Sequence, residues 1–205
     1  CKIGNKSNEA IKLAINKLKN HCNKYNLKWN NDYMFIGIRT DEDLDNSFDD
    51  YFLFIQNDVI VFVSPASTVS GTPGITKYWS RIIRGRSGVG TVMENQQINY
   101  LVVKPVKGNT WSMWTGGLGF LYQDKPISIY RGAVKINNVW CYNKENIAHN
   151  DLGGGFNVHS WSNWLSPVIN NLSEGCQVCQ ANYWRILFNY LDNYNRVTYT
   201  LILNR

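Results

Sequence analysis

The chain has 205 residues, which fits one medium-sized domain or one domain with a short additional element. Hydrophobic residues make up 44% of it and aromatic residues 14%, enough to form a core and to exclude a disordered chain. The formal net charge is +6, but the basic residues are scattered along the sequence. We therefore expect no nucleic-acid partner, because nucleic-acid binding needs a basic stripe with interleaved aromatic residues or a recognised motif.

No run of about 18 apolar residues is present, so the sequence predicts no membrane span. The chain begins without Met and without the apolar core of a signal peptide, which indicates a mature form or a fragment. Cys1 would then be either a lipid-modified residue or an arbitrary boundary of the chain. There are five cysteines, an odd and sparse set that argues against a disulfide scaffold.

Helical spacing of apolar residues behind Ser7, a suitable N-cap, predicts a helix over residues 7–25. Residues 41–46 form an acidic turn, residues 64–74 a polar loop, and residues 56–58 a hairpin-like connection. A second helix is expected over about residues 180–193. Short runs rich in β-branched and aromatic residues predict strands at 33–38, 51–55, 59–63, 98–103, 120–122, 127–130, 133–136, 156–159 and 197–203.

Many short strands separated by turns, with helices only near the ends, predict a mostly β fold of sandwich or barrel type. Arg131 and Gly132 would form a tight turn between two of these strands. The chain would comprise an N-terminal helical segment, residues 1–30, and a main domain, residues 31–205. The second helix would follow Cys176 in the sequence.

Nucleophilic catalysis by a cysteine needs a nearby base, usually a histidine that is itself held in orientation. The sequence offers three histidines. His21 lies among Lys and Asn residues of the first predicted helix, where we expect a surface position. His149 lies in a loop before a run of glycines, and His159 ends a short strand and is followed by Ser160.

Cys176 is preceded by small and flexible residues and followed by a β-branched one, in the order Ser173-Glu174-Gly175-Cys176-Gln177-Val178. This pattern predicts a loop entering a strand, with the backbone N–H groups of Gly175 and Cys176 close to the thiol. A lone cysteine after glycine, or a lone histidine at a strand end, is more often structural than catalytic.

Together, His159-Ser160 and the later Ser173-x-Gly175-Cys176 resemble the active-site signature of the L,D-transpeptidase catalytic domain family. That family carries His-Gly or His-Ser on one strand and Ser-His-Gly-Cys after a variable loop. The form Ser-x-Gly-Cys-Gln is similar to a divergent bacterial and phage branch of the family. A looser resemblance runs from about residue 33 to residue 180. It includes residues 36–39, 48–51, 72–74 and 130–131.

The resemblance implies a β-sandwich or barrel-like catalytic fold and a thiol mechanism that needs no metal or other cofactor. His159 would take the proton of Cys176, and the backbone at Ser160 would orient the imidazole. The thiolate would attack the carbonyl of an L,D peptide bond in a peptidoglycan stem peptide. An amine (cross-linking) or water (trimming or lysis) would then release the thioester.

The resemblance also implies the residues of the oxyanion site and the substrate pocket. The N–H groups of Cys176 and Gly175 would stabilise the oxyanion, and Ser173 would form a hydrogen bond within the loop. Glu174 and Gln177 would lie at the pocket, where the family carries a histidine before the glycine and an arginine after the cysteine. These two replacements predict a narrower or different acyl donor.

Three alternatives stay open on the sequence. The first is a phage-type lytic peptidoglycan peptidase that uses water. The second is a catalytically inactive cell-wall-binding module, whose aromatic segments at residues 111–114 and 161–164 would stack on sugars. The third is a zinc site built from Cys176, Cys179 and a histidine. The first two and the main hypothesis share one location, outside the cytoplasm, in the periplasm or cell envelope, or phage-encoded and acting on the host wall.

Overall fold

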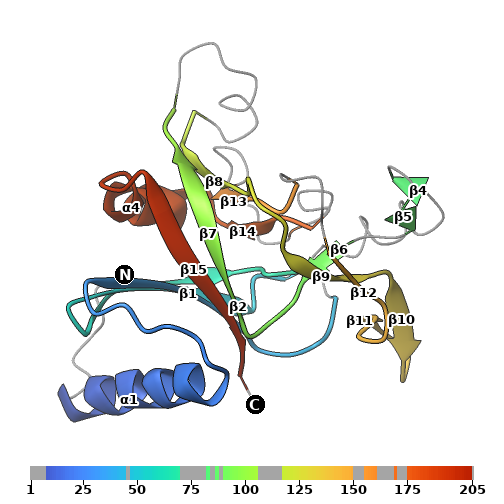
Figure 1. Ribbon diagram of the computed structural model, residues 1–205, viewed down its shortest axis with the longest axis horizontal. Helices are drawn as coiled ribbons and strands as arrows, with labels where there is room; N and C mark the ends of the chain where they lie inside the picture. Colours follow the sequence, from blue (N-terminus) through green and yellow to red (C-terminus); the bar gives the residue numbers. More distant parts are fainter. Residues whose placement is uncertain are drawn as a thin grey trace.

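The computed structural model describes residues 8–44, 47–69, 82–83, 86–87, 90–105, 117–149, 155–160, 169 and 175–204. The mostly β fold predicted from the sequence is confirmed, with one helix near each end of the described chain (Figure 1). The helices are α1 (Asn8–Lys24) and α4 (Ala181–Leu191). Both lie within a residue or two of the ranges expected from their apolar spacing.

The main sheet of the described chain has eight strands. In spatial order they are β14 (Gln177–Cys179), β13 (Val158–Ser160), β8 (Phe120–Tyr122), β7 (Gln96–Val103), β15 (Arg196–Leu203), β1 (Tyr33–Arg39), β2 (Asp50–Gln56) and β3 (Val59–Ala66). The smaller sheets contain β10 (Ala133–Ile136) with β11 (Val139–Tyr142), β12 (Ile147–His149) with β9 (Ser128–Arg131) and β6 (Gly90–Val92), and β4 (Ile82–Ile83) with β5 (Arg86–Ser87).

The two edges of the main sheet meet at Ser67 and Val178, so the sheet closes into a barrel-like form. Ser67 N donates to Val178 O at 2.7 Å, and Val178 N donates to Ser67 O at 2.8 Å. This antiparallel bridge joins the end of β3 to β14, the first and last strands of the sheet. Closure satisfies edge groups that an open sheet would leave exposed, and it fixes β14 from both sides.

The barrel interior is filled by large aromatic and aliphatic side chains, as expected from alternation along half-buried strands. Phe35 of β1, Tyr100 of β7 and Tyr199 of β15 are fully buried in one core cluster. Helix α4 adds apolar side chains to the same cluster, and its Trp184 Nε1 donates to Gly119 O at 2.7 Å. The helix that follows Cys176 in the sequence is therefore anchored to the barrel core.

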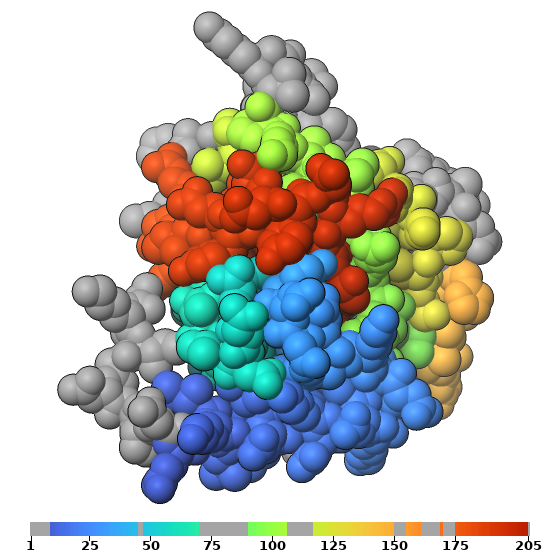
Figure 2. All heavy atoms as spheres, turned by 60° about the vertical axis from the view of Figure 1, so that its left-hand side comes forward, coloured from blue at the N-terminus to red at the C-terminus, as the bar shows by residue number. Residues whose placement is uncertain are grey.

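Helix α1 covers the outer face of the barrel and belongs to the same body. Its Leu18 and Cys22 pack with Met34, Ile36 and Leu53 in a second cluster. Figure 2 shows α1, in dark blue, lying along β1–β3 at the lower side of the molecule. The predicted N-terminal helical segment is thus a layer packed on the sheet.

A buried polar network holds the chain that follows β3. The Arg39 guanidinium donates to Thr68 Oγ1, Thr68 O and Val92 O, each at 2.9 Å, and its Nη1 lies 3.3 Å from Glu94 Oε2. Thr68 in turn donates its N–H and its hydroxyl to Asp50 Oδ2, each at 2.7 Å. The network therefore fixes Thr68 directly beside Ser67, the residue that closes the barrel.

The structure differs from the sequence predictions in three local features. Gly132 has φ of 79°, as a tight turn needs, but the strands on either side do not pair with each other. β9 pairs with β6 and β12, whereas β10 pairs with β11. His149, expected in a loop, is the last residue of β12, and the predicted loop at 64–74 begins only after Ala66.

Candidate active site

The parallel pairing of β13 with β14 brings the two predicted catalytic residues to neighbouring positions. His159 is the register partner of Val178, and Cys176 stands directly before β14, two residues ahead of Val178. Partners in a parallel pair share a face of the sheet, and side chains two residues apart in an extended chain do as well. By this alternation, we expect the side chains of His159 and Cys176 on the same face of the sheet.

His159 is held in one tautomer by its own strand. The ring is buried, with 8% exposure, and Nδ1–H donates to the carbonyl oxygen of Ser160 at 2.6 Å. Because a carbonyl can only accept, this bond places the ring proton on Nδ1 and leaves Nε2 as an acceptor. Burial lowers the pKa of His159, and the bond to Ser160 acts in the opposite direction. The neutral imidazole is thus a proton acceptor near pH 7.

Cys176 is the only partly exposed cysteine in the described part of the chain. Its thiol lies 3.5 Å from Gly155 O, at hydrogen-bond distance for a sulfur donor. Burial raises the pKa of Cys22, Cys141 and Cys179, with the Cys141 value reaching about 11. A thiol reagent or substrate would therefore meet Cys176 before the other three.

The residue before Cys176 must be glycine. Gly175 has φ of 140°, in the region that favours glycine, and it lies against the barrel wall. A Cβ at this position would stand 2.6 Å from Phe156 Cε1 and 2.9 Å from Gly90 O, distances that side chains do not adopt. Gly175 thus lets the chain pass close to Phe156 and turn Cys176 into β14.

Tyr100 is a neighbour of the site that sequence reasoning missed. Its hydroxyl donates to Phe156 O at 2.8 Å. Burial raises its pKa, and the charge of Cys176 adds to that shift. In the sequence Tyr100 looks like any core aromatic residue of a strand, so no local signal separates it from Tyr199.

Gln177 points away from His159, into the barrel. It is fully buried, and its Oε1 accepts a hydrogen bond from the Tyr199 hydroxyl. Its Nε2 has no hydrogen-bond partner among the described residues. The side chain expected at the substrate pocket therefore anchors β14 to β15 through the core.

The other sequence candidates are placed as follows. Ser173, Glu174, Cys1 and the aromatic segments at 111–114 and 161–164 lie outside the described residues. His21, expected at the surface, is half-buried, with Nε2 2.7 Å from Asn95 Oδ1. Cys179 is buried beside Ser160.

Two classes of feature are not found in the described part of the chain. No cluster of three or more His, Cys, Asp or Glu side chains there could hold a metal ion. The helices there are also too short or too polar to cross a membrane.

Comparison of the whole chain with protein-family models, with curated proteins and with solved structures gives no match to any of them. A function can therefore be inferred only from the residues themselves: a buried, oriented imidazole on β13 and a partly exposed thiol directly before β14.

Proposed function

We propose that the chain is a cysteine-dependent enzyme that processes peptidoglycan, cleaving L,D peptide bonds of stem peptides through a thioester. The single observation that supports this best is the β13–β14 register, in which His159 pairs with Val178, two residues after Cys176. The similarity of the His-Ser and Ser-x-Gly-Cys motifs to the L,D-transpeptidase signature supplies the substrate class. Such a substrate places the reaction outside the cytoplasm, in an envelope or on the wall of a phage host.

The proposed reaction starts with transfer of the thiol proton of Cys176 to Nε2 of His159. The thiolate attacks the stem-peptide carbonyl, the C–N bond breaks, and the imidazolium returns its proton to the departing amine. Water or an acceptor amine then attacks the thioester, His159 takes the proton of that nucleophile, and the C–S bond breaks. The imidazolium then returns this proton to the departing Cys176 thiolate. The Ser160 carbonyl holds Nδ1–H throughout and stabilises the imidazolium when it forms.

The proposal includes an oxyanion site at the turn before β14. The N–H of Gln177 donates to Asn157 O at 2.9 Å and belongs to the strand pairing. The resemblance to the L,D-transpeptidase signature assigns the oxyanion donors to the backbone at Cys176 and Gly175, and the positive φ of Gly175 permits the turn there.

The test is product analysis on purified muropeptides with the unmodified chain, Cys176→Ala and His159→Gln. We expect Cys176→Ala to abolish turnover and His159→Gln to reduce it by about 10²–10⁴-fold. Cys141→Ala, which removes a buried thiol, is the matched control and should retain activity.

The products separate the open alternatives. New cross-linked dimers would identify transfer, and released stem peptides would identify hydrolysis, as in a phage-type lytic peptidase. Wall binding without any product would identify an inactive binding module. Full activity in Cys176→Ala would exclude the thiol mechanism.

A further inference from the structure

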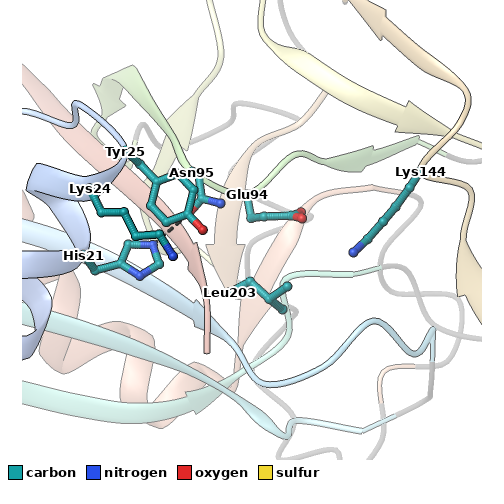
Figure 3. Close-up of a pocket in the computed structure, with 7 residues that line it drawn as sticks. All are labelled: His21, Lys24, Tyr25, Glu94, Asn95, Lys144 and Leu203. Atoms are coloured by element: carbon teal, nitrogen blue, oxygen red, sulfur yellow. Dashed lines mark hydrogen bonds between the residues drawn. The ribbon is translucent and has the colours of Figure 1, made fainter. Parts of the chain in front are cut away.

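A pocket of about 150 Å³ lies on the surface between four segments that are distant in sequence. It is lined by the C-terminal end of α1, the turn at Glu94 and Asn95, Lys144 after β11, and Leu203 at the end of β15. In Figure 3, Lys144 reaches into the pocket from one side, and His21 and Lys24 face it from the other. The pocket shares no lining residue with the surroundings of Cys176 and His159.

Glu94 lines the pocket, and its carboxylate is held in place by neighbouring side chains and neutralised by Arg39. Glu94 Oε2 pairs with Arg39 and lies 3.5 Å from the Tyr142 hydroxyl, and Oε1 accepts from the Tyr130 hydroxyl at 3.2 Å. These three bonds use most of the roughly four acceptor positions of a carboxylate. The charge of Glu94 is therefore compensated within the protein, and it repels an entering anion only weakly.

The remaining polar groups of the pocket are mostly donors. Lys144 donates to Glu42 and lies 5.6 Å from the Tyr142 ring, which holds its ammonium group in place with further N–H donors to offer. Lys24 forms no ion pair with any residue of the described chain, and its Nζ lies 5.1 Å from the Tyr25 ring. With the pairs Arg39–Glu94 and Lys144–Glu42 cancelled, the described residues that line the pocket carry one uncompensated positive charge, that of Lys24.

We propose that this pocket binds a small anion through a carboxylate or phosphate group, held between Lys24 and Lys144. A donor-rich pocket with a net positive charge needs an acceptor-rich, negative ligand to satisfy it. Its volume is well above the roughly 10–15 Å³ that one water molecule needs, so a polyatomic group fits. The site is independent of the proposed thiol chemistry.

The test is titration of the full chain with sodium phosphate and, separately, with sodium acetate, followed by amide chemical shifts in two-dimensional NMR. Sodium chloride at matched ionic strength is the reference. We expect saturable shifts centred on Lys24, Asn95 and Lys144, and at least tenfold weaker binding in Lys24→Met. Lys17→Met, an exposed lysine of the same helix outside the pocket, should bind as the unmodified chain does.

Each outcome decides the matter. Saturation by phosphate alone assigns a phosphate ligand, by acetate alone a carboxylate ligand, and by both a general anion site. Shifts that chloride reproduces at the same ionic strength would overturn the proposal. So would an affinity unchanged in both Lys24→Met and Lys144→Met.

Discussion

The hydroxyl of Tyr199 donates a hydrogen bond to Oε1 of Gln177, the residue that follows Cys176. Both side chains are fully buried, so the bond crosses the interior from β15 to β14 without competing water. Gly37, on β1 beside Tyr199, leaves the space that the hydroxyl occupies. The position of the candidate nucleophile is therefore set partly by residues far from it in sequence.

Replacing Tyr199 with Phe removes the hydroxyl that donates to Gln177 Oε1. The buried amide oxygen is then left without a donor, which should destabilise the fold. A buried polar group left unpaired costs about 1–3 kcal/mol, so the free energy of unfolding should fall by that amount. Denaturant unfolding followed by fluorescence measures it. Tyr190→Phe, at the edge of the same core, is the matched control and should change stability less. Equal midpoints for Tyr199→Phe and the unmodified chain would contradict this role.

Replacing Gly37 with Ala should be more damaging, because the new Cβ would stand 1.7 Å from the Tyr199 hydroxyl oxygen. Overpacking of this kind costs about 1–3 kcal/mol or more. In a Tyr199→Phe background the oxygen is gone, so Gly37→Ala should cost less there than in the unmodified chain. Chemical denaturation of the unmodified chain, the two single variants and the double variant measures this difference. If the two substitutions change the free energy of unfolding additively, the contact between Gly37 and the Tyr199 hydroxyl is refuted.

Stability should decrease on acidification because of His159. Its pKa is lowered in the folded state, so below the ordinary value of about 6.5 the unfolded chain binds a proton that the folded chain does not. The stability contributed by the neutral imidazole is complete above about pH 6.5 and is lost as the pH falls through the folded pKa. His159→Gln should flatten this slope between pH 7 and 5, whereas His149→Gln should not. The same slope in both variants would argue against a buried neutral His159.

Alkaline pH should destabilise the protein through Tyr130. Burial, with the charge of Glu94 and the bond to it, raises the pKa of Tyr130 to about 12, above the usual value of about 10. Between these values the unfolded chain loses a proton that the folded chain keeps, so stability falls as the pH rises. Tyr130→Phe should show a shallower decline in unfolding free energy between pH 10 and 12. Tyr183→Phe serves as the control, and identical slopes would contradict the shift.

Local periodicity was sufficient to predict both helices and most strands, since amphipathic spacing is a property of neighbouring residues. The hairpin of β2 and β3, for example, follows from two apolar runs around residues 56–58, where Asn57 and Asp58 adopt positive φ. Barrel closure could not be predicted in this way. The bridge from Ser67 to Val178 and the parallel pairing of β1 with β15 depend on contacts between distant segments.

The site shows the same division. His159, Cys176 and Gly175 are recognisable because their residue types and order suggest thiol chemistry. The inward direction of Gln177 depends on where β14 begins, and the hydrogen bond from Tyr100 to Phe156 O depends on contacts between distant segments. The burial of Arg39 was equally hidden, because nothing next to it in the chain reveals its partner Glu94.

Acylation of Cys176 is the step on which the proposed mechanism depends, and intact-protein mass spectrometry after incubation with purified muropeptides detects it. We expect a mass increase equal to one stem-peptide acyl group, trapped most readily in a short incubation and located on Cys176 by peptide mapping. The adduct should be absent in Cys176→Ala and present in Cys141→Ala. Turnover by Cys176→Ala, or acylation at another residue, would contradict a mechanism in which Cys176 is the nucleophile.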